Sequence, residues 1–158
     1  MNAAHLHLMV NHFPLFASLF GGLIAAVGVY RERTTLIRTG LVLTVVAALG
    51  AFVAVETGEG AEEVVEEVTG VSRATIHDHE EAAEAAMWAL AAAALLSLAA
   101  LVVPGRRDRA KYFTTLAALG ATFVAFALVA RAANLGGMIR HPEITSATSV
   151  EATGLREA

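Results

Sequence analysis

The sequence predicts an all-α membrane protein, an antiparallel, up-down bundle of four transmembrane helices. Two observations predict it. Hydrophobic residues make up 56% of the 158 residues and charged residues only 16%, a balance too apolar for an ordinary soluble domain of this size. The apolar residues also fall into four long runs, at 13–30, 36–55, 85–103 and 112–133. Each run is about as long as a helix that crosses the ~30 Å hydrocarbon core of a bilayer. A soluble bundle would need a polar stripe on each helix, which these runs lack.

The first helix is expected to begin at Phe13-Pro14, because proline is favoured in the first helical turn and disfavours a helical residue before it. The residues before it then form an extended arm that folds over the bundle. In an extended chain, His5 and His7 would place both rings on one side.

The connection at 57–80, between the second and third spans, is expected to hold a short amphipathic helix that lies on the bilayer surface as a lid and stops at Gly70. The alternative is a solvated acidic linker. Ser72 is expected to cap the helix that follows. The apolar stripe of the short helix consists of Ala61, Val64, Val65 and Val68.

The two other connections carry most of the positive charge. Together they hold seven of the eleven Lys and Arg residues and only two acidic residues. The positive-inside rule places them in the cytoplasm, so both termini and the 57–80 connection face outward. Residues 1–142 are expected to form one transmembrane domain, and 143–158 a flexible polar tail. The seven basic residues are Arg31, Arg33, Arg38, Arg106, Arg107, Arg109 and Lys111.

All six histidines are then expected on the outer side. Three precede the first span, two precede the third, and one follows the fourth: His5, His7, His12, His77, His79 and His141. The chain has no cysteine, which excludes disulfides, thiolate ligands and Cys-anchored haem or iron–sulfur clusters. No basic surface for nucleic acid is present, and the expected partner is the lipid bilayer.

The segment "HLMVNHFP" at 7–14 resembles the opening motif of a family of small bacterial four-span membrane proteins known as a domain of unknown function, with the pattern His-Pro-x-x-Val-His-Phe-Pro. His7, His12, Phe13 and Pro14 match the motif, whereas Leu8 and Asn11 replace its Pro and Val. The "ETG" at 56–58 and the "GG" at 136–137 are weaker similarities. The resemblance implies a small multi-pass membrane protein of bacteria. Together with the orientation expected from the positive-inside rule, it predicts a protein of the inner membrane with both termini and the histidines on the periplasmic side. Some members of the wider family are joined to Rieske-type domains, which implies a redox setting.

The leading functional hypothesis is a haem b-binding electron-transfer protein or redox-complex subunit. Non-covalent haem needs axial ligands from facing segments, and His7, His12, His79 and His141 are the candidates, with His12 and His79 expected to face each other. Arg131 is expected to pair with a propionate, with Asn134 about one turn away.

Two alternatives remain open. The first is a membrane metalloprotein, possibly an enzyme, with a Zn, Cu or Fe site of imidazoles and carboxylates. Its candidate ligands are His5, His7, His12, His79, His141, Glu56 and Glu80. The second is a non-catalytic scaffold subunit of a larger membrane complex, whose histidines are only interfacial anchors. Whether the chain is an enzyme is left undecided by the sequence.

Overall fold

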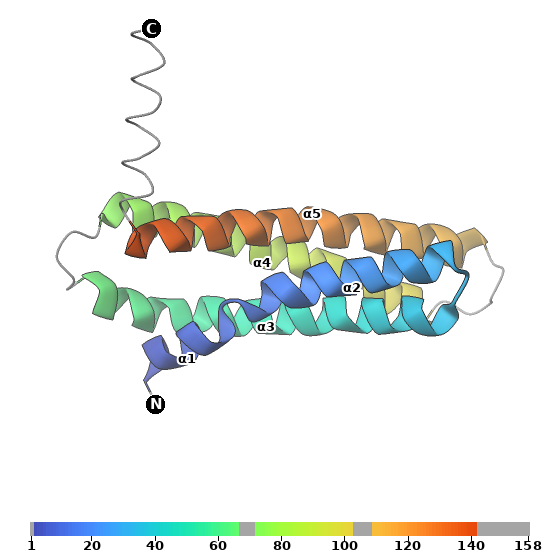
Figure 1. The fold of residues 1–158 in the computed structure, drawn as a ribbon, viewed down its shortest axis with the longest axis horizontal. Coiled ribbons are helices and arrows are strands. Elements are labelled where there is room, and N and C mark those ends of the chain that lie inside the picture. The colour runs from blue at the N-terminus through green and yellow to red at the C-terminus, as the bar shows by residue number, and fades with distance from the viewer. Residues whose placement is uncertain (1, 67–71, 103–108, 142–158) are drawn as a thin grey trace, which may run out of the picture.

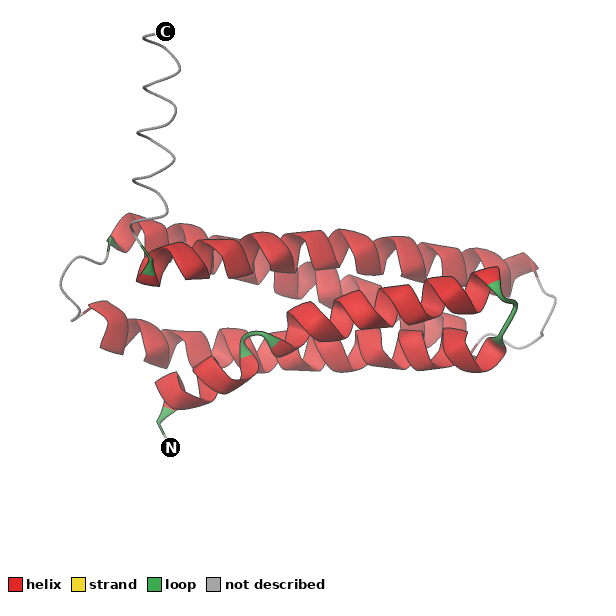
Figure 2. Cartoon of the chain, in the orientation of Figure 1, coloured by secondary structure: helices red, strands yellow, loops and turns green. Residues whose placement is uncertain are grey.

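The computed structural model describes residues 2–66, 72–102 and 109–141, and the regular structure among them is entirely helical (Figure 1, Figure 2). This confirms the predicted all-α class. The expected tail at 143–158, the end of the proposed amphipathic helix at 67–71 and the basic residues Arg106 and Arg107 lie outside the described residues. The helices are α1 (Ala3–Val10), α2 (Phe13–Tyr30), α3 (Thr34–Glu66), α4 (Arg73–Val102) and α5 (Arg109–Arg140).

The segment before Pro14 is helical, so the prediction of an extended arm is wrong. Asn2 caps α1, because its side-chain oxygen accepts a hydrogen bond from the backbone N–H of His5 at 3.0 Å. The chain breaks at Asn11 and His12, since Pro14 has no N–H to donate to the carbonyl four residues earlier. Helix α2 then begins at Phe13, as predicted. In the helical α1, the rings of His5 and His7 leave the chain on different faces.

The prediction of a separate short helix within 57–80 is also wrong. Helix α3 continues without a break from Thr34 to Glu66, so the segment that carries Ala61 and Val64 extends the second span. Its sequence is rich in Glu, which favours helix, and neither Gly58 nor Gly60 interrupts the backbone ladder. Helix α4 begins at Arg73, one residue after Ser72. His77 and His79 therefore lie inside the first turns of α4 rather than before it.

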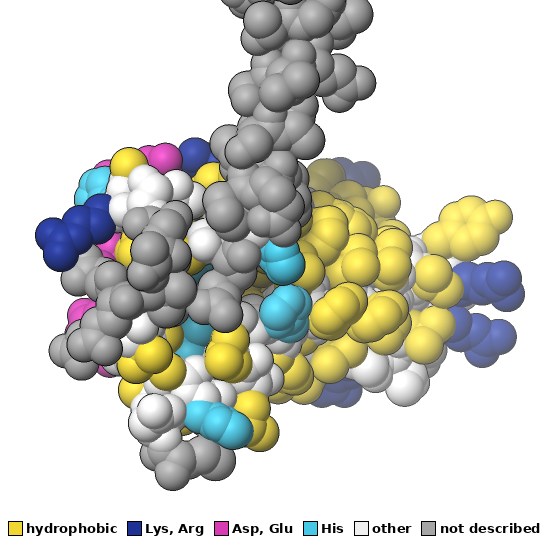
Figure 3. Space-filling view, turned by 60° about the vertical axis from the view of Figure 1, so that its left-hand side comes forward, with side chains coloured by type: hydrophobic (Ala, Val, Ile, Leu, Met, Phe, Trp, Pro, Cys, Tyr) yellow, Lys and Arg dark blue, Asp and Glu magenta, His cyan; other side chains and the backbone are white. Residues whose placement is uncertain are grey.

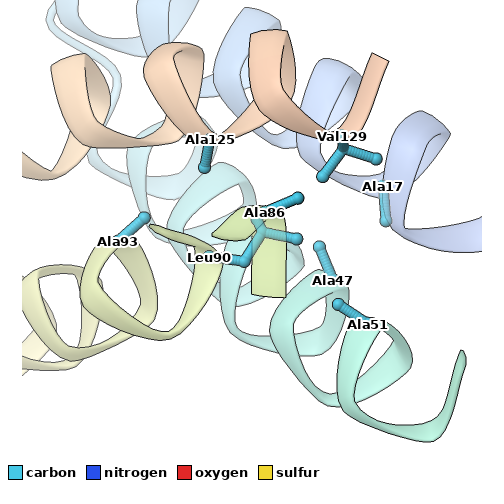
Figure 4. Close-up of a cluster of buried hydrophobic side chains, with 8 residues drawn as sticks. All are labelled: Ala17, Ala47, Ala51, Ala86, Leu90, Ala93, Ala125 and Val129. Atoms are coloured by element: carbon cyan, nitrogen blue, oxygen red, sulfur yellow. The ribbon is translucent and has the colours of Figure 1, made fainter. Parts of the chain in front are cut away.

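The four long helices pack as a bundle in which α2 and α4 each contact both α3 and α5. Its interior is built from small side chains. Leu90 is the only large aliphatic residue among the described side chains that are below 2% exposed. Figure 4 shows the main core cluster, where alanines from all four helices surround Leu90 and Val129. Small residues let helix backbones approach closely, which is how helices associate where no hydrophobic driving force exists between them.

Helices α2 and α3 approach each other most closely at their glycines. A Cβ atom on Gly40 would lie 2.6 Å from the backbone nitrogen of Ala25 and would also collide with the carbonyl oxygen of Gly21. A Cβ on Gly28 would lie 2.5 Å from the backbone nitrogen of Ile37. Backbone therefore packs against backbone along this interface, with no space for a side chain at these positions.

The large apolar side chains face outward. Leu95 and Leu49 are 69% and 64% exposed, and Phe16, Phe20 and Val124 are also exposed. Four helical segments are long and apolar enough to cross a membrane, and the first of them combines α1 and α2. A bundle with small residues inside and large apolar residues outside is typical of multi-pass membrane proteins.

Candidate functional site

All six histidines lie at one end of the bundle. Figure 1 shows that α1, the end of α3, the start of α4 and the end of α5 meet there. We call this the histidine end, formed by residues 2–12, 54–66, 72–84 and 132–141. Figure 3 shows the histidine and acidic side chains gathered at this end together with some basic ones, and further basic side chains beyond the hydrophobic surface at the other end. The topology thus brings imidazoles from three distant segments to one end, as the sequence predicted.

His7 is the histidine of α1 that faces the bundle. Its ring is half-buried, and Nδ1 lies 2.9 Å from the carbonyl oxygen of Ala54 on α3. The hydroxyl group of Thr57 donates a hydrogen bond to the carbonyl oxygen of Val53 at 2.8 Å. Its oxygen lies 3.5 Å from Nδ1 of His7. Gly58 lies next to the edge of the ring, and a Cβ atom at that position would be 3.8 Å from Cε1 of His7. The packing of α1 against α3 therefore fixes one ring position.

His79 occupies the equivalent position on α4. Its ring is half-buried, and Nδ1 lies 2.9 Å from the carbonyl oxygen of Ala132 on α5. Gly136, one turn further along α5, makes the space for the ring, since a Cβ there would lie 3.0 Å from Cε1. The packing of α4 against α5 therefore fixes a second ring.

The two rings share one hydrogen-bonding arrangement. A carbonyl oxygen only accepts, so Nδ1 of each ring must carry the proton that is donated. In a neutral imidazole this leaves Nε2 unprotonated, with its lone pair available. Metal-ligating histidines almost always donate their other ring N–H in this way. In both rings, the hydrogen bond to a backbone carbonyl therefore fixes the tautomer that leaves Nε2 available.

The other four histidines are exposed. His77 Nε2 lies 3.4 Å from a carboxylate oxygen of Glu81, one turn along α4. His12, expected to face His79, lies at the break between α1 and α2, and its ring bonds to the side chain of Asn11. His5 lies on the outer face of α1, and His141 directly follows α5. The histidine of α1 that turns toward the bundle is His7, which bonds to the backbone of α3.

Arg131 and Asn134 lie on an exposed face of α5, whereas the neighbouring Ala132 is buried. Neither side chain points into the core at the level of His79. The two carboxylates considered as metal ligands are also exposed. One of them, Glu80, lies close to Glu62 of α3.

Within residues 2–66, 72–102 and 109–141, no group of three or more His, Asp or Glu side chains is placed to hold a metal ion. In that part of the chain, the expected ligands other than His7 and His79 lie on exposed faces. Only His7 and His79 combine partial burial with a fixed orientation.

Several residues that shape the site have no signature in the sequence. Ala54 and Ala132 contribute backbone carbonyls, and any residue type offers the same group. Thr57 and Gly136 stand beside the rings of His7 and His79. Two weak signals were available: the "ETG" at 56–58 includes Thr57, and the Gly-Gly pair at 136–137 resembles a helix stop yet lies inside α5.

Comparison with known proteins adds no relative: no family model, no curated protein and no solved structure matches this chain.

Proposed function

We propose that the chain is an integral membrane protein that binds haem b through His7 and His79 and serves in electron transfer, alone or as a subunit of a redox complex. One observation carries the proposal. Two half-buried imidazoles from different helices each bond a backbone carbonyl through Nδ1, at 2.9 Å, which leaves both Nε2 atoms free.

The residues present fit a b-type haem. Two neutral imidazoles are a complete axial set, and the chain has no cysteine that would bind the porphyrin covalently. The surroundings of both rings are small residues of α3 and α5: Ala54, Gly58, Ala132 and Gly136. A bound haem would supply one-electron redox chemistry. The protein's own part is to hold both imidazoles in one tautomer and to set the polarity around them.

The proposed setting is the bacterial inner membrane, with an antiparallel, up-down bundle and with the histidine end and both termini on the periplasmic side. The four apolar helices and the basic opposite end support this orientation. Exposed aromatic residues support insertion of the bundle in a membrane, with Trp88 toward the histidine end and Tyr30 and Tyr112 toward the basic end. The resemblance of 7–14 to the four-span family belongs to the same proposal.

Absorption spectra of the detergent-purified protein, expressed with haem and metals available, test the binding of haem. We expect a Soret band that sharpens on reduction with dithionite and resolved α and β bands. His7→Ala and His79→Ala should each convert the low-spin spectrum to a high-spin one or abolish it, because one axial ligand is lost. His5→Ala and His77→Ala are the matched controls, since both side chains are exposed, and they should leave the spectrum unchanged.

Three results would contradict this proposal. A low-spin spectrum that survives both single substitutions would show that other residues are the ligands. Stoichiometric Zn, Cu or Fe without a Soret band would favour the metalloprotein. Neither haem nor metal in the loaded preparation would favour the scaffold subunit.

The orientation is tested by cysteine labelling, because the chain has no cysteine of its own and gives no background. We expect Ser72→Cys, at the histidine end, to react in spheroplasts with a membrane-impermeant maleimide. Arg33→Cys, at the opposite end, should react only after the membrane is permeabilised. Both side chains are exposed, so accessibility within the fold does not bias the comparison. The reverse labelling pattern would place the histidine end in the cytoplasm.

A further inference from the structure

Three hydroxyl groups lie in the middle of the bundle interior. Thr44 of α3, Ser97 of α4 and Thr122 of α5 are each at most 1% exposed. We call them the hydroxyl layer. Along each helix, the hydroxyl residue lies between a member of the main core cluster and a member of the second cluster, which is nearer the basic end. These flanking residues are Ala47 and Leu41, Ala93 and Ala100, and Ala125 and Ala118.

The two threonine hydroxyl groups lie within hydrogen-bonding distance of more acceptors than they have protons to donate. Thr44 Oγ1 lies 3.2 Å from the carbonyl oxygen of Gly40 and 3.2 Å from Thr122 Oγ1. Thr122 Oγ1 lies 2.8 Å from the carbonyl oxygen of Ala118. Three contacts need three protons, and two hydroxyl groups supply only two. Whichever contacts are made, the threonine oxygens keep lone pairs that no described donor fills.

Ser97, in contrast, has a hydroxyl proton but no acceptor for it among the described residues. Its Oγ has no hydrogen-bond partner among the residues that the structure describes, although the side chain is 0% exposed. A hydroxyl inside a helix ordinarily donates to the carbonyl four residues earlier. The four other buried hydroxyls do so, and they belong to Ser18, Thr44, Thr115 and Thr122. A buried polar atom without a partner, in a layer with unfilled acceptors, indicates a ligand.

We propose that the hydroxyl layer binds one water molecule, which accepts the proton of Ser97 and donates to the Thr44–Thr122 pair. Water is the ligand that fits, because it both accepts and donates and because buried waters typically make about three hydrogen bonds. The layer contains no charged side chain, so an ion would lack a counter-charge. The residues one turn from Ser97, Ala93 and Ala100, are small. The bound water links α4 to α3 and α5 through the centre of the bundle.

The test is a double-substitution cycle on the full chain in detergent micelles, with unfolding followed during SDS titration. We expect Ser97→Ala and Thr122→Val each to lower the unfolding midpoint. The double variant should lose hardly more than the larger single loss, because the first substitution already removes the water. The matched control is Ser18→Ala, whose hydroxyl donates to the carbonyl of Pro14 at 2.7 Å. Its effect should add to that of Thr122→Val.

A second measurement keeps the proposal testable if a variant folds poorly. NMR magnetisation transfer from water to the Ser97 amide is expected in the unsubstituted protein and should be lost in Thr122→Val. Absence of that transfer in the unsubstituted protein would overturn the proposal. A rise in midpoint for Ser97→Ala would also overturn it, because it would mean that the hydroxyl is buried without any partner. Additive effects in the cycle would overturn it as well.

Discussion

Gly40→Ala is expected to lower the free energy of unfolding by about 1–3 kcal/mol, the usual cost of forcing extra atoms into a packed interior. The added methyl group would meet the backbone of α2, at the nitrogen of Ala25 and the carbonyl oxygen of Gly21. Backbone atoms cannot rotate away as a side chain can, so α2 and α3 would have to separate. SDS titration of the purified protein, with helicity as the readout, measures the change.

Gly120→Ala is the matched control for that substitution. Both glycines lie inside long helices, and alanine is the better helix former by up to about 1 kcal/mol. A Cβ on Gly120 has nothing within 4 Å. We therefore expect Gly120→Ala to be neutral or stabilising. Equal effects of the two substitutions would show that α2 and α3 are not in tight contact at Gly40.

Gly136→Val is expected to weaken haem binding about 10–100-fold, the usual effect of disturbing a group that orients a metal ligand. It changes no ligand. A Cβ at this position lies 3.0 Å from Cε1 and 3.3 Å from Nδ1 of His79, and the extra methyl groups of valine crowd the ring further. The ring would be displaced from the carbonyl oxygen of Ala132, which now holds it at 2.9 Å. Haem titration of the apoprotein, followed at the Soret band, measures the affinity.

Gly137→Val controls for the cost of a β-branched residue in α5. It places the same side chain one residue further along, where a Cβ has nothing within 4 Å. The affinity for haem should stay within about twofold of the unsubstituted protein, because His79 is not touched. If both variants bound haem equally well, the contact between Gly136 and His79 would have no role in the site.

The positions of the apolar helical segments could be predicted from the sequence, because hydropathy identifies them. The first run, 13–30, coincides with α2, whose ends are marked by Pro14 and by the short turn at 31–33. The other three helices extend beyond their apolar runs, because hydropathy marks where a helix meets lipid and not where its backbone ladder ends. Charged segments such as 61–66 continue α3, since Glu favours helix and is also well solvated. Such a segment has the same composition whether it continues α3 or forms a separate helix. For this reason the prediction of a separate lid helix was wrong.

From the sequence, the site could be assigned to one end of the molecule but not to particular side chains. The distribution of positive charge and the positions of the histidines predicted that all six imidazoles lie at one end. They did not predict which two rings are held by hydrogen bonds to backbone carbonyls. The choice of His7 over His12 depends on whether the first residues are helical, which the cap at Asn2 decides. It also depends on carbonyl oxygens of Ala54 and Ala132, and no side-chain pattern reveals these.

The break at Asn11 and His12 has a consequence for how the protein matures. Helix α1 has no buried residue and packs mainly against α3, whereas His79 is anchored by the interface between α4 and α5. The four-helix body can therefore form before α1 settles onto it. His7 would then arrive last and close the histidine end. Such an order would let a ligand enter a finished bundle before residues 2–11 cover it.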